Sequence, residues 1–510
     1  MTFIEADGSW PIVWERARGV HVWDVEGKKF LDLTAAFGVA AAGHANPRVV
    51  KAGQKQMARL LHAMGDVHPH PLKAALAREL SRITFERWAH LGTAAGGCPA
   101  NERLESRRTH GLLSPALSSR GGEGGPSAVH WLHAASFQGS GSPDVRGRRT
   151  QTGKTIFCNS GFEAVEAALK TALLATGRPG LIAFAGAYHG VGYGALNATH
   201  RDHFRAPFLS QLREFGQFVP FPRAGQAFGR SLSKSTARGK GLEVNRGDAR
   251  SALEAVESQI RKHFRRERIG AILVEPIQVR GGINIPPPEF LPMLRRVCDE
   301  QKALLILDEI YTGFGRTGKW FACEHSATVP DVICVGKALT GGFPLSACVG
   351  RAKLMDAAWP RTSGEAIHTS TFLGHPVGCA MALAQIEEIR ANKLIQRSAE
   401  LGRVLLSALQ TLNRRLRAAG ERSKGGPTLQ VQTRGLGLLA GVEFRLRDGK
   451  PATAIALEIT KQMLHRGFIV LPEGEHSNVL GFTPPLTLTR DQLNSAVNAL
   501  EEVWAEVQGG

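Results

Sequence analysis

The chain lacks the features that mark several common protein classes. Its seven cysteines are scattered, with no Cys-x-x-Cys pair and an odd total, so a disulfide framework and a zinc site are both disfavoured. No apolar run approaches the roughly 18 residues that a membrane-spanning helix needs. The N-terminus has Glu5 and Asp7 in place of a basic segment followed by an apolar one, which disfavours a secretory signal. These absences predict a cytoplasmic protein with reduced, buried cysteines, no bound metal and no membrane partner.

Acidic residues are scarce relative to basic ones. The chain has 45 Asp and Glu against 63 Lys and Arg, a net charge of +18, and such an excess can indicate a nucleic-acid partner. Here much of it falls in a loop-like stretch over residues 223–250 and near the end of the helix expected to follow. Neither interleaved aromatic residues nor a nucleic-acid motif accompanies it. We therefore expect a solvated basic surface and no nucleic-acid partner.

What is present is an alternation of strands and helices. The 510 residues, 43% of them hydrophobic, are enough for two or more domains. Short apolar runs separated by stretches with helical spacing predict an α/β fold, with a mainly parallel sheet covered on both faces. The expected strands are 155–158, 181–184, 271–275, 304–308, 332–335 and 347–350, and the expected helices between them include 161–176, 251–264 and 290–302.

The two ends of the chain differ from this central pattern. Residues 19–33 alternate around Glu26-Gly27 and predict a hairpin. Residues 376–420 have the spacing of long helices, and residues 428–446 and 467–473 indicate strands of a smaller α/β lobe. The division that we predict is a small domain formed by residues 1–45 and 385–510, and a large domain formed by residues 46–384.

One stretch inside the predicted large domain has a different composition. Between about residues 86 and 153 no sustained periodicity is present, and residues 111–127 and 136–150 are rich in Gly, Ser and Pro. Such composition cannot bury much apolar surface. We expect a mobile surface insertion, with a few apolar residues such as Trp88 that could dock.

Residues suited to ligand binding follow four of the expected strands. In open parallel sheets, ligands bind beyond the carboxyl ends of the strands. Ser160 and Gly161 follow the first strand and open a helix, whose bare N–H groups and dipole attract an anion. Tyr188 and His189 follow the second, where an aromatic ring can stack on a planar ligand. By itself, each pair also fits a plainer interpretation, a serine helix cap or a locally packed turn.

The other two strand exits carry stronger chemistry. Asp308 ends the run LLILD, and a buried carboxylate needs a cationic or hydrogen-bonding partner, such as a protonated pyridine nitrogen. Lys337 closely follows the run VICV, where desolvation would lower the pKa of its amine and favour Schiff-base chemistry. A turn-capping Asp308 and a solvent-facing Lys337 are the plainer interpretations. The occurrence of all four motifs in this order is much harder to explain by chance.

The sequence resembles the class III aminotransferases that depend on pyridoxal 5′-phosphate (PLP), the group of acetylornithine, ornithine and 4-aminobutyrate aminotransferases. The resemblance covers nearly the whole chain outside the insertion. The matching segments include NSGFEAVEAALK, YHG, VEPIQ, LDEIYTGFGRTG, GKALTGGFPLSA and STFLGHPVGCAMALA. The spacing of 29 residues from Asp308 to Lys337 within these motifs is highly specific. The resemblance implies the fold type I of PLP-dependent transferases, with a mainly parallel sheet of the seven-stranded type and a smaller lobe from both termini.

The resemblance also implies roles for the motif residues. Lys337 would hold PLP covalently and move the proton during catalysis. Asp308 would keep the pyridine nitrogen protonated, so that the ring can accept electrons. The other implied cofactor contacts are Ser160, Gly161 and Phe162 at the phosphate, Tyr188 stacked on the ring, His189, Glu275, Gln278 and Tyr311 nearby, and Thr371 from the neighbouring subunit of a homodimer.

The sequence departs from the family at five positions. Phe162 stands where many members have Thr, and Tyr311 where several have a Gln that contacts the phenolic oxygen of the cofactor. Arg280 and Gly481 stand where several members have a Glu and an Arg that pair with each other. We hypothesise that Arg280 binds a substrate carboxylate; the alternative is a structural ion pair. Val191 replaces an Arg of acetylornithine enzymes, which argues against that substrate.

The function that we expect is amino transfer. The donor would be an ω-amino acid or a diamine, and the acceptor an oxo acid such as 2-oxoglutarate or pyruvate. An amino-acid racemase or epimerase, or an aminomutase, shares these motifs, and a racemase needs no acceptor. A catalytically inactive binding protein on the same scaffold is the third possibility, although the intact Lys337 and Asp308 disfavour it.

Overall fold

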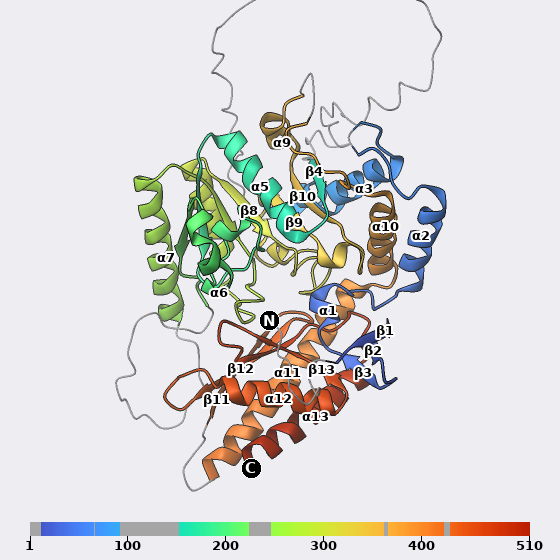
Figure 1. The fold of residues 1–510 in the computed structure, drawn as a ribbon. Coiled ribbons are helices and arrows are strands. Elements are labelled where there is room, and N and C mark those ends of the chain that lie inside the picture. The colour runs from blue at the N-terminus through green and yellow to red at the C-terminus, as the bar shows by residue number, and fades with distance from the viewer. Residues whose placement is uncertain are drawn as a thin grey trace, which may run out of the picture.

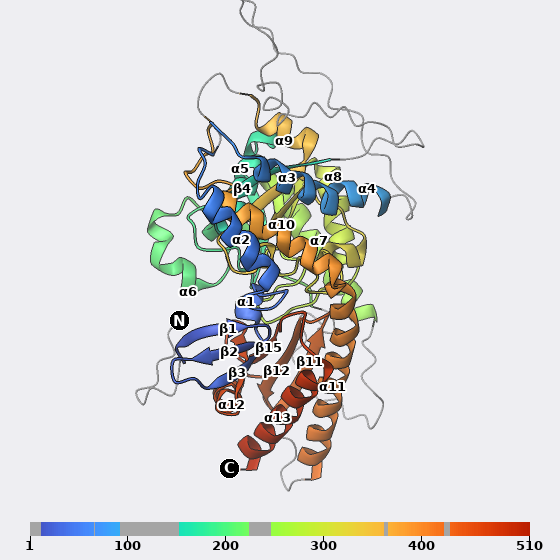
Figure 2. The same cartoon turned by 90° about the vertical axis from the view of Figure 1, so that its right-hand side faces the viewer.

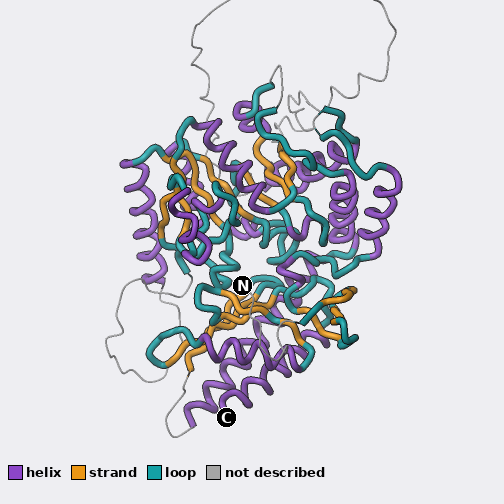
Figure 3. Tube along the Cα trace, viewed as in Figure 1, coloured by secondary structure: helices purple, strands orange, loops and turns teal. Residues whose placement is uncertain are grey.

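The computed structural model describes residues 12–65, 67–91, 152–223, 246–361, 366–422 and 429–509. These residues form a larger α/β part and, below it in Figure 1, a smaller part that combines the first strands of the chain with its last strands and helices. Helices flank the strands of the larger part (Figure 3). The arrangement follows the alternation of strands and helices along the sequence.

The larger part is built on a seven-stranded sheet with the order β4-β10-β9-β8-β7-β5-β6. Neighbours from β9 to β6 are parallel, whereas β10 runs antiparallel to both β4 and β9. The mainly parallel sheet is confirmed, and β6, which lacks a continuous apolar run, is an addition to the predicted strands. The bounds are β4 Gly153–Cys158, β5 Gly180–Phe184, β6 Gly216–Val219, β7 Ile269–Val274, β8 Leu304–Asp308, β9 Val332–Val335 and β10 Ser346–Arg351.

Helices cover both faces of this sheet. Along β8, Ile306 packs in the core beneath α5, while Leu305 and Leu307 pack in the core beneath α8 on the other face. Burial on both faces is the reason that the strands are continuous apolar runs. The helices of this part are α2 Pro47–Arg59, α3 Pro71–Ser81, α4 Arg87–Leu91, α5 Gly161–Thr176, α6 Asp202–Arg205, α7 Arg246–Arg266, α8 Phe290–Gln301, α9 Ala352–Ala358 and α10 Pro376–Ala391.

The smaller part contains two four-stranded sheets, β1-β2-β3-β13 and β11-β12-β15-β14. In the first, Phe468 and Ile469 of β13 pair in parallel with Leu31 and Asp32 of β3, so the two ends of the chain share one sheet. Figure 2 shows β1–β3 beside the C-terminal helices. The bounds are β1 Trp14–Arg18, β2 His21–Asp24, β3 Lys29–Asp32, α1 Ala35–Gly38, α11 Leu394–Arg422, β11 Leu429–Gly435, β12 Ala440–Leu446, α12 Thr453–His465, β13 Phe468–Ile469, β14 Leu471–Glu473, β15 Val479–Phe482 and α13 Arg490–Gly509.

The start of the predicted insertion belongs to the folded core. A π-helical turn ends at Glu86 and continues into α4. Trp88, only 2% exposed, packs edge-on against Phe85 and Phe321. The prediction that the surface insertion begins at about residue 86 is therefore wrong, because burial of this indole fixes α4. Residues 92–151 of the predicted insertion lie outside the described residues, and its last residue, Gly153, is the first residue of β4.

The described cysteines are unpaired and buried, as the sequence predicts. They are Cys158, Cys298, Cys323, Cys334, Cys348 and Cys379. Cys98 lies outside the described residues. Among the helices that the structure describes, none has the length and apolar character to cross a membrane.

Candidate active site

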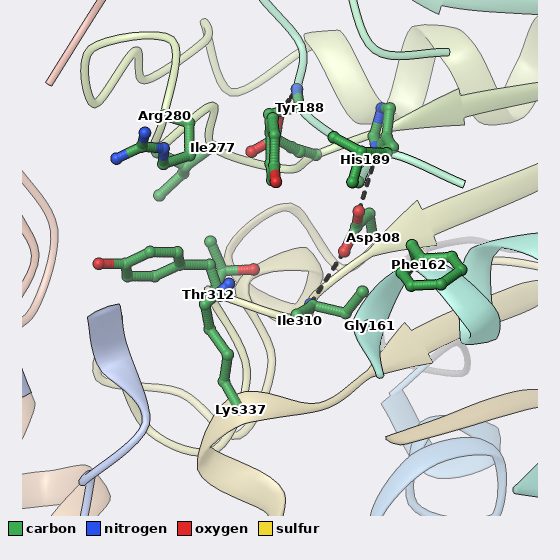
Figure 4. Close-up of a pocket in the computed structure, with 14 residues that line it drawn as sticks. Gly161, Phe162, Tyr188, His189, Ile277, Arg280, Asp308, Ile310, Thr312 and Lys337 are labelled. Atoms are coloured by element: carbon green, nitrogen blue, oxygen red, sulfur yellow. Dashed lines mark hydrogen bonds and ion pairs between the residues drawn. The ribbon is translucent and has the colours of Figure 1, made fainter. Parts of the chain in front are cut away.

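The carboxyl ends of the parallel strands border a pocket of about 230 Å³. Because β5, β7, β8 and β9 run the same way, the residues that follow them reach one edge of the sheet. Figure 4 shows Lys337, Asp308, His189 and Gly161 converging there. We call Lys337, Asp308, His189 and the first residues of the α5 turn, Ser160 and Gly161, the pocket floor.

Lys337 follows β9 in a short turn and has a left-handed backbone, with φ of 40°. Such strain in a residue other than glycine is characteristic of functional sites. Its Nζ lies 4.7 Å from the ring centroid of Tyr311. Burial lowers the pKa of the Lys337 amine, while the charges of Asp308 and Glu275 raise it. The lowered pKa increases the share of neutral amine, which is the nucleophilic form.

Asp308, at the end of β8, has both carboxylate oxygens engaged. Oδ2 lies 2.8 Å from Nδ1 of His189, and Oδ1 accepts the backbone N–H of Ile310 at 3.1 Å. The His189 backbone N–H donates to Thr199 Oγ1 at 2.9 Å, which fixes the backbone that carries the imidazole. Asp308 is 5% exposed and His189 2%. The carboxylate is thus buried and held in one orientation toward the pocket.

The N-terminus of α5 has hydrogen-bond donors that are suited to an anion. The Glu163 carboxylate accepts the N–H groups of Asn159 at 2.6 Å and Ser160 at 3.0 Å, which fixes the turn. The N–H groups of Gly161 and Phe162 come next, in the first turn, where a helix offers no internal acceptor. Ser160 Oγ is buried without a hydrogen-bond partner among the described residues. A phosphate would satisfy these donors.

Phe162, at the position of the family's Thr, has a packing role. A Cβ added at Gly190 would lie 2.3 Å from Phe162 Cβ, and one added at Gly192 would lie 2.6 Å from its Cδ2. The ring therefore packs against the glycine loop that follows Tyr188-His189 and holds it on α5. A threonine side chain lacks the ring that contacts Gly192.

Glu275 connects the loops that follow β5 and β7 at the side of the pocket. It follows β7, and its oxygens accept the backbone N–H groups of Tyr188 at 3.0 Å and Val279 at 3.3 Å. Burial raises the pKa of the Glu275 carboxyl to about 7, although the charge of His189 opposes this. The ring of Tyr188 lines the pocket (Figure 4) and packs edge-on against Phe204, with centroids 5.1 Å apart.

Gln278 and Thr371 lie away from the pocket in this single chain. The Gln278 amide donates to the carbonyl of Ala185 at 2.9 Å and accepts from Asn284 at 3.2 Å, so it braces the loop after β7. Thr371 is exposed, in a turn that precedes α10. Neither residue belongs to the pocket lining.

Tyr311 lines the pocket, and its hydroxyl points to the smaller part of the molecule. The hydroxyl lies 3.3 Å from Thr483 Oγ1, which in turn donates to the carbonyl of Thr34 at 2.9 Å. On the other side, a Cβ at Gly38 would lie only 2.8 Å from the Tyr311 ring. The ring is thus positioned by residues from both ends of the chain.

Arg280 forms an ion pair that crosses between the two parts of the molecule. Its Nη1 lies 3.2 Å from Oε2 of Glu473, at the end of β14. A Cβ at Gly481 would lie 3.0 Å from Cγ of Glu473, so Glu473 occupies the space beside this glycine. The guanidinium lies 5.8 Å from the ring centroid of Phe37 and 6.0 Å from that of Tyr188. We call Arg280, Glu473 and Phe37 the pocket mouth.

Phe37 reaches the mouth through an unusual backbone. Ala35, Ala36, Phe37 and Gly38 all have left-handed φ angles, of 48°, 49°, 61° and 80°. Each such non-glycine residue costs about 1–2 kcal/mol. Buried Asp32 compensates by accepting hydrogen bonds from this turn, including the N–H of Ala36 at 3.1 Å. The turn holds the Phe37 side chain 47% exposed beside Arg280.

Comparison with known proteins identifies the family. The family model described as aminotransferase class-III matches residues 3–104 and 145–504. The chain belongs to this family. The gap between the two matched segments, residues 105–144, falls inside the predicted insertion. The protein is therefore a class III aminotransferase, an enzyme that depends on PLP.

Two relatives and a solved structure illustrate the similarity of this class III aminotransferase to others. The acetylornithine aminotransferase of Methanosarcina mazei is 30% identical over 97% of this chain and 92% of its own. The putrescine aminotransferase of Pectobacterium atrosepticum is 31% identical over 99% of this chain and 85% of its own. An amine transaminase structure from an uncultivated Pseudomonas species shows the same fold, with a TM-score of 0.75 and 24% sequence identity. The similarity covers 99% of this chain and 97% of that one.

The pocket floor of this class III aminotransferase fits PLP. The orphaned Ser160 Oγ and the α5 N-terminus suit a phosphate. The buried Asp308 carboxylate suits a protonated ring nitrogen, and the Lys337 amine suits an aldehyde carbon. Gly161, Phe162, Asp308 and Lys337 line one pocket, and Ser160 directly precedes Gly161, so the chemistry that the family requires is present in the residues of this chain.

Sequence reasoning missed two charged residues of this class III aminotransferase. Glu473 ends the run GFIVLPE much as Asp308 ends LLILD, and that pattern could have revealed it. Arg201 lies close enough to affect the pKa of Glu473, but nothing in its local sequence indicates a site. Both reach this region only through the packing of the two parts.

Proposed function

We propose that this class III aminotransferase transfers an amino group from an ω-amino acid or a diamine to an oxo acid such as 2-oxoglutarate or pyruvate. We further propose that it works as a homodimer in the cytoplasm. The observation that carries the proposal is the pocket floor, where a partly buried amine and a carboxylate braced by histidine face one cavity. The unpaired cysteines agree with a reducing compartment.

Lys337 and Asp308 are the proposed catalytic residues. PLP supplies an aldehyde that binds amines covalently and a ring that accepts electrons. The Lys337 Nζ, whose pKa is lowered by burial, would take a proton from the substrate carbon and deliver it to the cofactor carbon, and would move it the opposite way in the reverse stroke. The Asp308 carboxylate stabilises a proton on the ring nitrogen, and the hydrogen bond from His189 keeps that carboxylate in place.

The remaining floor and wall residues bind and orient the cofactor. We assign the phosphate to Ser160 Oγ and to the N–H groups of Gly161 and Phe162. Tyr188 stacks on the ring, and Glu275 positions Tyr188 through its backbone N–H. His189 acts through Asp308. Gln278 acts through the loop after β7 and Tyr311 through its ring beside Lys337.

Arg280 is the proposed site for a substrate carboxylate. Its guanidinium keeps donors beyond the one bonded to Glu473, and a planar fork matches a carboxylate. A diamine such as the one named for the Pectobacterium relative has no carboxylate, so this role of Arg280 applies to an ω-amino acid donor and to the oxo acid. Val191 at the pocket wall leaves no cation there for an acetylornithine carboxylate.

The proposed dimer would complete the site with Thr371. This residue precedes an exposed Phe372, whose ring contacts His62 at a centroid distance of 5.2 Å. Apolar side chains that are at least 40% exposed gather in the nearby segment after α2: Leu60, Leu61, Met64 and Val67. A second copy would cover this surface and bring its own Thr371 to the phosphate.

Borohydride reduction tests the covalent step. Reduction of the holoenzyme followed by peptide mapping should give a pyridoxyl label on Lys337. The Lys337→Ala variant should lose the label and the visible absorbance, whereas Lys353→Ala, at an exposed lysine, should keep both. A label elsewhere, or none, would overturn the assignment.

A substrate panel tests the reaction. Diamines, ω-amino acids and simple amines would each be combined with 2-oxoglutarate or pyruvate, and glutamate or alanine would be measured. We expect product only when an oxo acid is present. Turnover of an amino acid without any oxo acid would instead indicate a racemase or a mutase.

A further inference from the structure

The Tyr311 ring is held in one position by residues from both ends of the chain. Thr483 Oγ1 donates its only proton to the carbonyl of Thr34 at 2.9 Å. The Tyr311 hydroxyl, 3.3 Å from the same Oγ1, must therefore donate to it. A Cβ at Gly38 would lie 2.8 Å from Cε1 of the ring, so the ring packs closely on this glycine. The hydroxyl proton is thus used within the protein, and what Tyr311 offers to the pocket is its ring.

Lys337 has an amine that lacks a conventional partner. Among the described residues, its Nζ has neither a hydrogen-bond nor an ion-pair partner. The acidic groups that influence its pKa are Asp308, Glu275 and Glu473, and all three are engaged elsewhere. Asp308 pairs with His189, and Glu275 accepts backbone N–H groups. Glu473 belongs to an ion pair of its own.

The aromatic face of Tyr311 can take the place of such a partner. The Lys337 Nζ lies 4.7 Å from the ring centroid, within the roughly 6 Å over which an aromatic ring attracts an ammonium. Burial and the charge of Arg280 lower the pKa of this amine, so its protonated form needs a stabilising neighbour. Burial also raises the pKa of the Tyr311 hydroxyl, which keeps the phenol neutral.

We propose that the face of the Tyr311 ring binds the protonated amine of Lys337 whenever this amine is free of the cofactor. The inference rests on the proposed function, in which Lys337 Nζ becomes an ammonium on taking a proton from the substrate carbon. A base is more effective when its protonated form is stabilised, so the ring promotes this transfer. Tyr311 is a positioning residue that acts through Lys337. A glutamine, which several family members have at this position, has no aromatic face for the purpose.

Fluorination of the ring tests this contact with little change in shape. Fluorine withdraws electrons from the face of a ring and weakens its attraction for a cation. Tyr311→Phe would be prepared in the full-length chain with phenylalanine, difluorophenylalanine or trifluorophenylalanine at this one position. Loading with pyridoxamine 5′-phosphate, the amino form of the cofactor, leaves the Lys337 amine free. Acetic anhydride then acetylates neutral amines, and mass spectrometry compares Lys337, which lines the pocket, with the exposed Lys353.

A weaker ring should leave more of Lys337 in the neutral form. Tyr311→Phe retains the ring, and its acetylation of Lys337 at neutral pH should stay within about twofold of the wild type. The trifluorinated ring should raise this acetylation about three- to tenfold over the phenylalanine form, with the difluorinated ring between them. In single turnovers of the PLP-loaded enzyme with an amine donor, the rate should fall in the same order, because the base becomes weaker.

The same analogues at Phe221 provide the control. Phe221 is 4% exposed in the core of the larger part, and fluorination there should leave the acetylation of Lys337 unchanged. Equal acetylation across the series at Tyr311, an equal increase from Phe221, or single-turnover rates that do not fall with fluorination would overturn the proposal. A failure of the proposed function would show separately, as the absence of a pyridoxyl label on Lys337 after borohydride reduction.

Discussion

The floor and the mouth of the pocket are built in different ways. The floor consists of residues that follow parallel strands of one sheet, and its groups are fixed by backbone hydrogen bonds and by the pair of Asp308 with His189. The mouth combines the loop after β7, a left-handed turn near the N-terminus and the end of β14. The floor thus has one rigid frame, whereas the mouth depends on how two parts of the molecule meet. A rigid floor is suited to the chemistry that aminotransferases share. A mouth made of loops is suited to the selection of the substrate.

The largest effect should come from the floor. Asp308→Asn removes the charge that stabilises a proton on the cofactor ring, and kcat should fall about 10²–10³-fold. Steady-state kinetics and the visible absorbance of the bound cofactor measure this. The control is Glu309→Gln, because Glu309 faces away from the pocket and accepts from Thr312, Ala322 and Cys323. A wild-type kcat in Asp308→Asn would contradict the role of this carboxylate.

A smaller and selective effect should come from the mouth. Arg280→Ala removes the proposed carboxylate site, and KM for an ω-amino acid donor should rise about 10–100-fold. KM for a plain amine should change no more than about threefold. Arg205→Ala provides the control for loss of a buried arginine. Equal increases for both donors would mean that Arg280 has only a structural role.

The contact between the left-handed turn near the N-terminus and the Tyr311 ring can be tested through Gly38. Its φ is 80°, and a Cβ there would lie 2.8 Å from the Tyr311 ring. Gly27 has nearly the same φ, 81°, with nothing within 4 Å, so Gly27→Ala carries the backbone strain alone. Chemical denaturation should show that Gly38→Ala lowers the free energy of unfolding by about 1–2 kcal/mol more than Gly27→Ala. Equal losses would mean that the Tyr311 ring moves freely.

The smallest expected effect is on stability, and it concerns Glu309, the buried residue that follows Asp308. Burial raises the pKa of the Glu309 carboxyl to about 7 from an ordinary 4.5. The native state therefore binds more protons between these pH values, and the free energy of unfolding falls as pH rises through them. Glu309→Gln should reduce this fall by about 1 kcal/mol between pH 6 and pH 7, measured by denaturation at these two pH values. Glu458→Gln, at an exposed position, should leave the fall unchanged.

The sequence predicted the floor better than the mouth for a physical reason. Asp308 and Lys337 each follow a continuous apolar run. Such runs can be recognised in the sequence because both faces of the sheet are buried. Glu473 follows a similar run, but its partner Arg280 lies 193 residues away. The boundary of the insertion was missed because Trp88 is fixed by contacts with Phe85 and Phe321, of which one lies far along the chain.

The sequence by itself determined most of the order of strands and helices and the mainly parallel sheet, because these depend on local apolar periodicity. It also placed Asp308 and Lys337 at strand ends, and their proposed catalytic roles come from the resemblance to the family. Only the tertiary structure decided that Arg280 pairs with Glu473 and that Phe37 and Tyr311 meet beside Lys337. These contacts join segments from both ends of the chain to the central sheet. No local pattern encodes them, since they arise from the packing of two separately built parts.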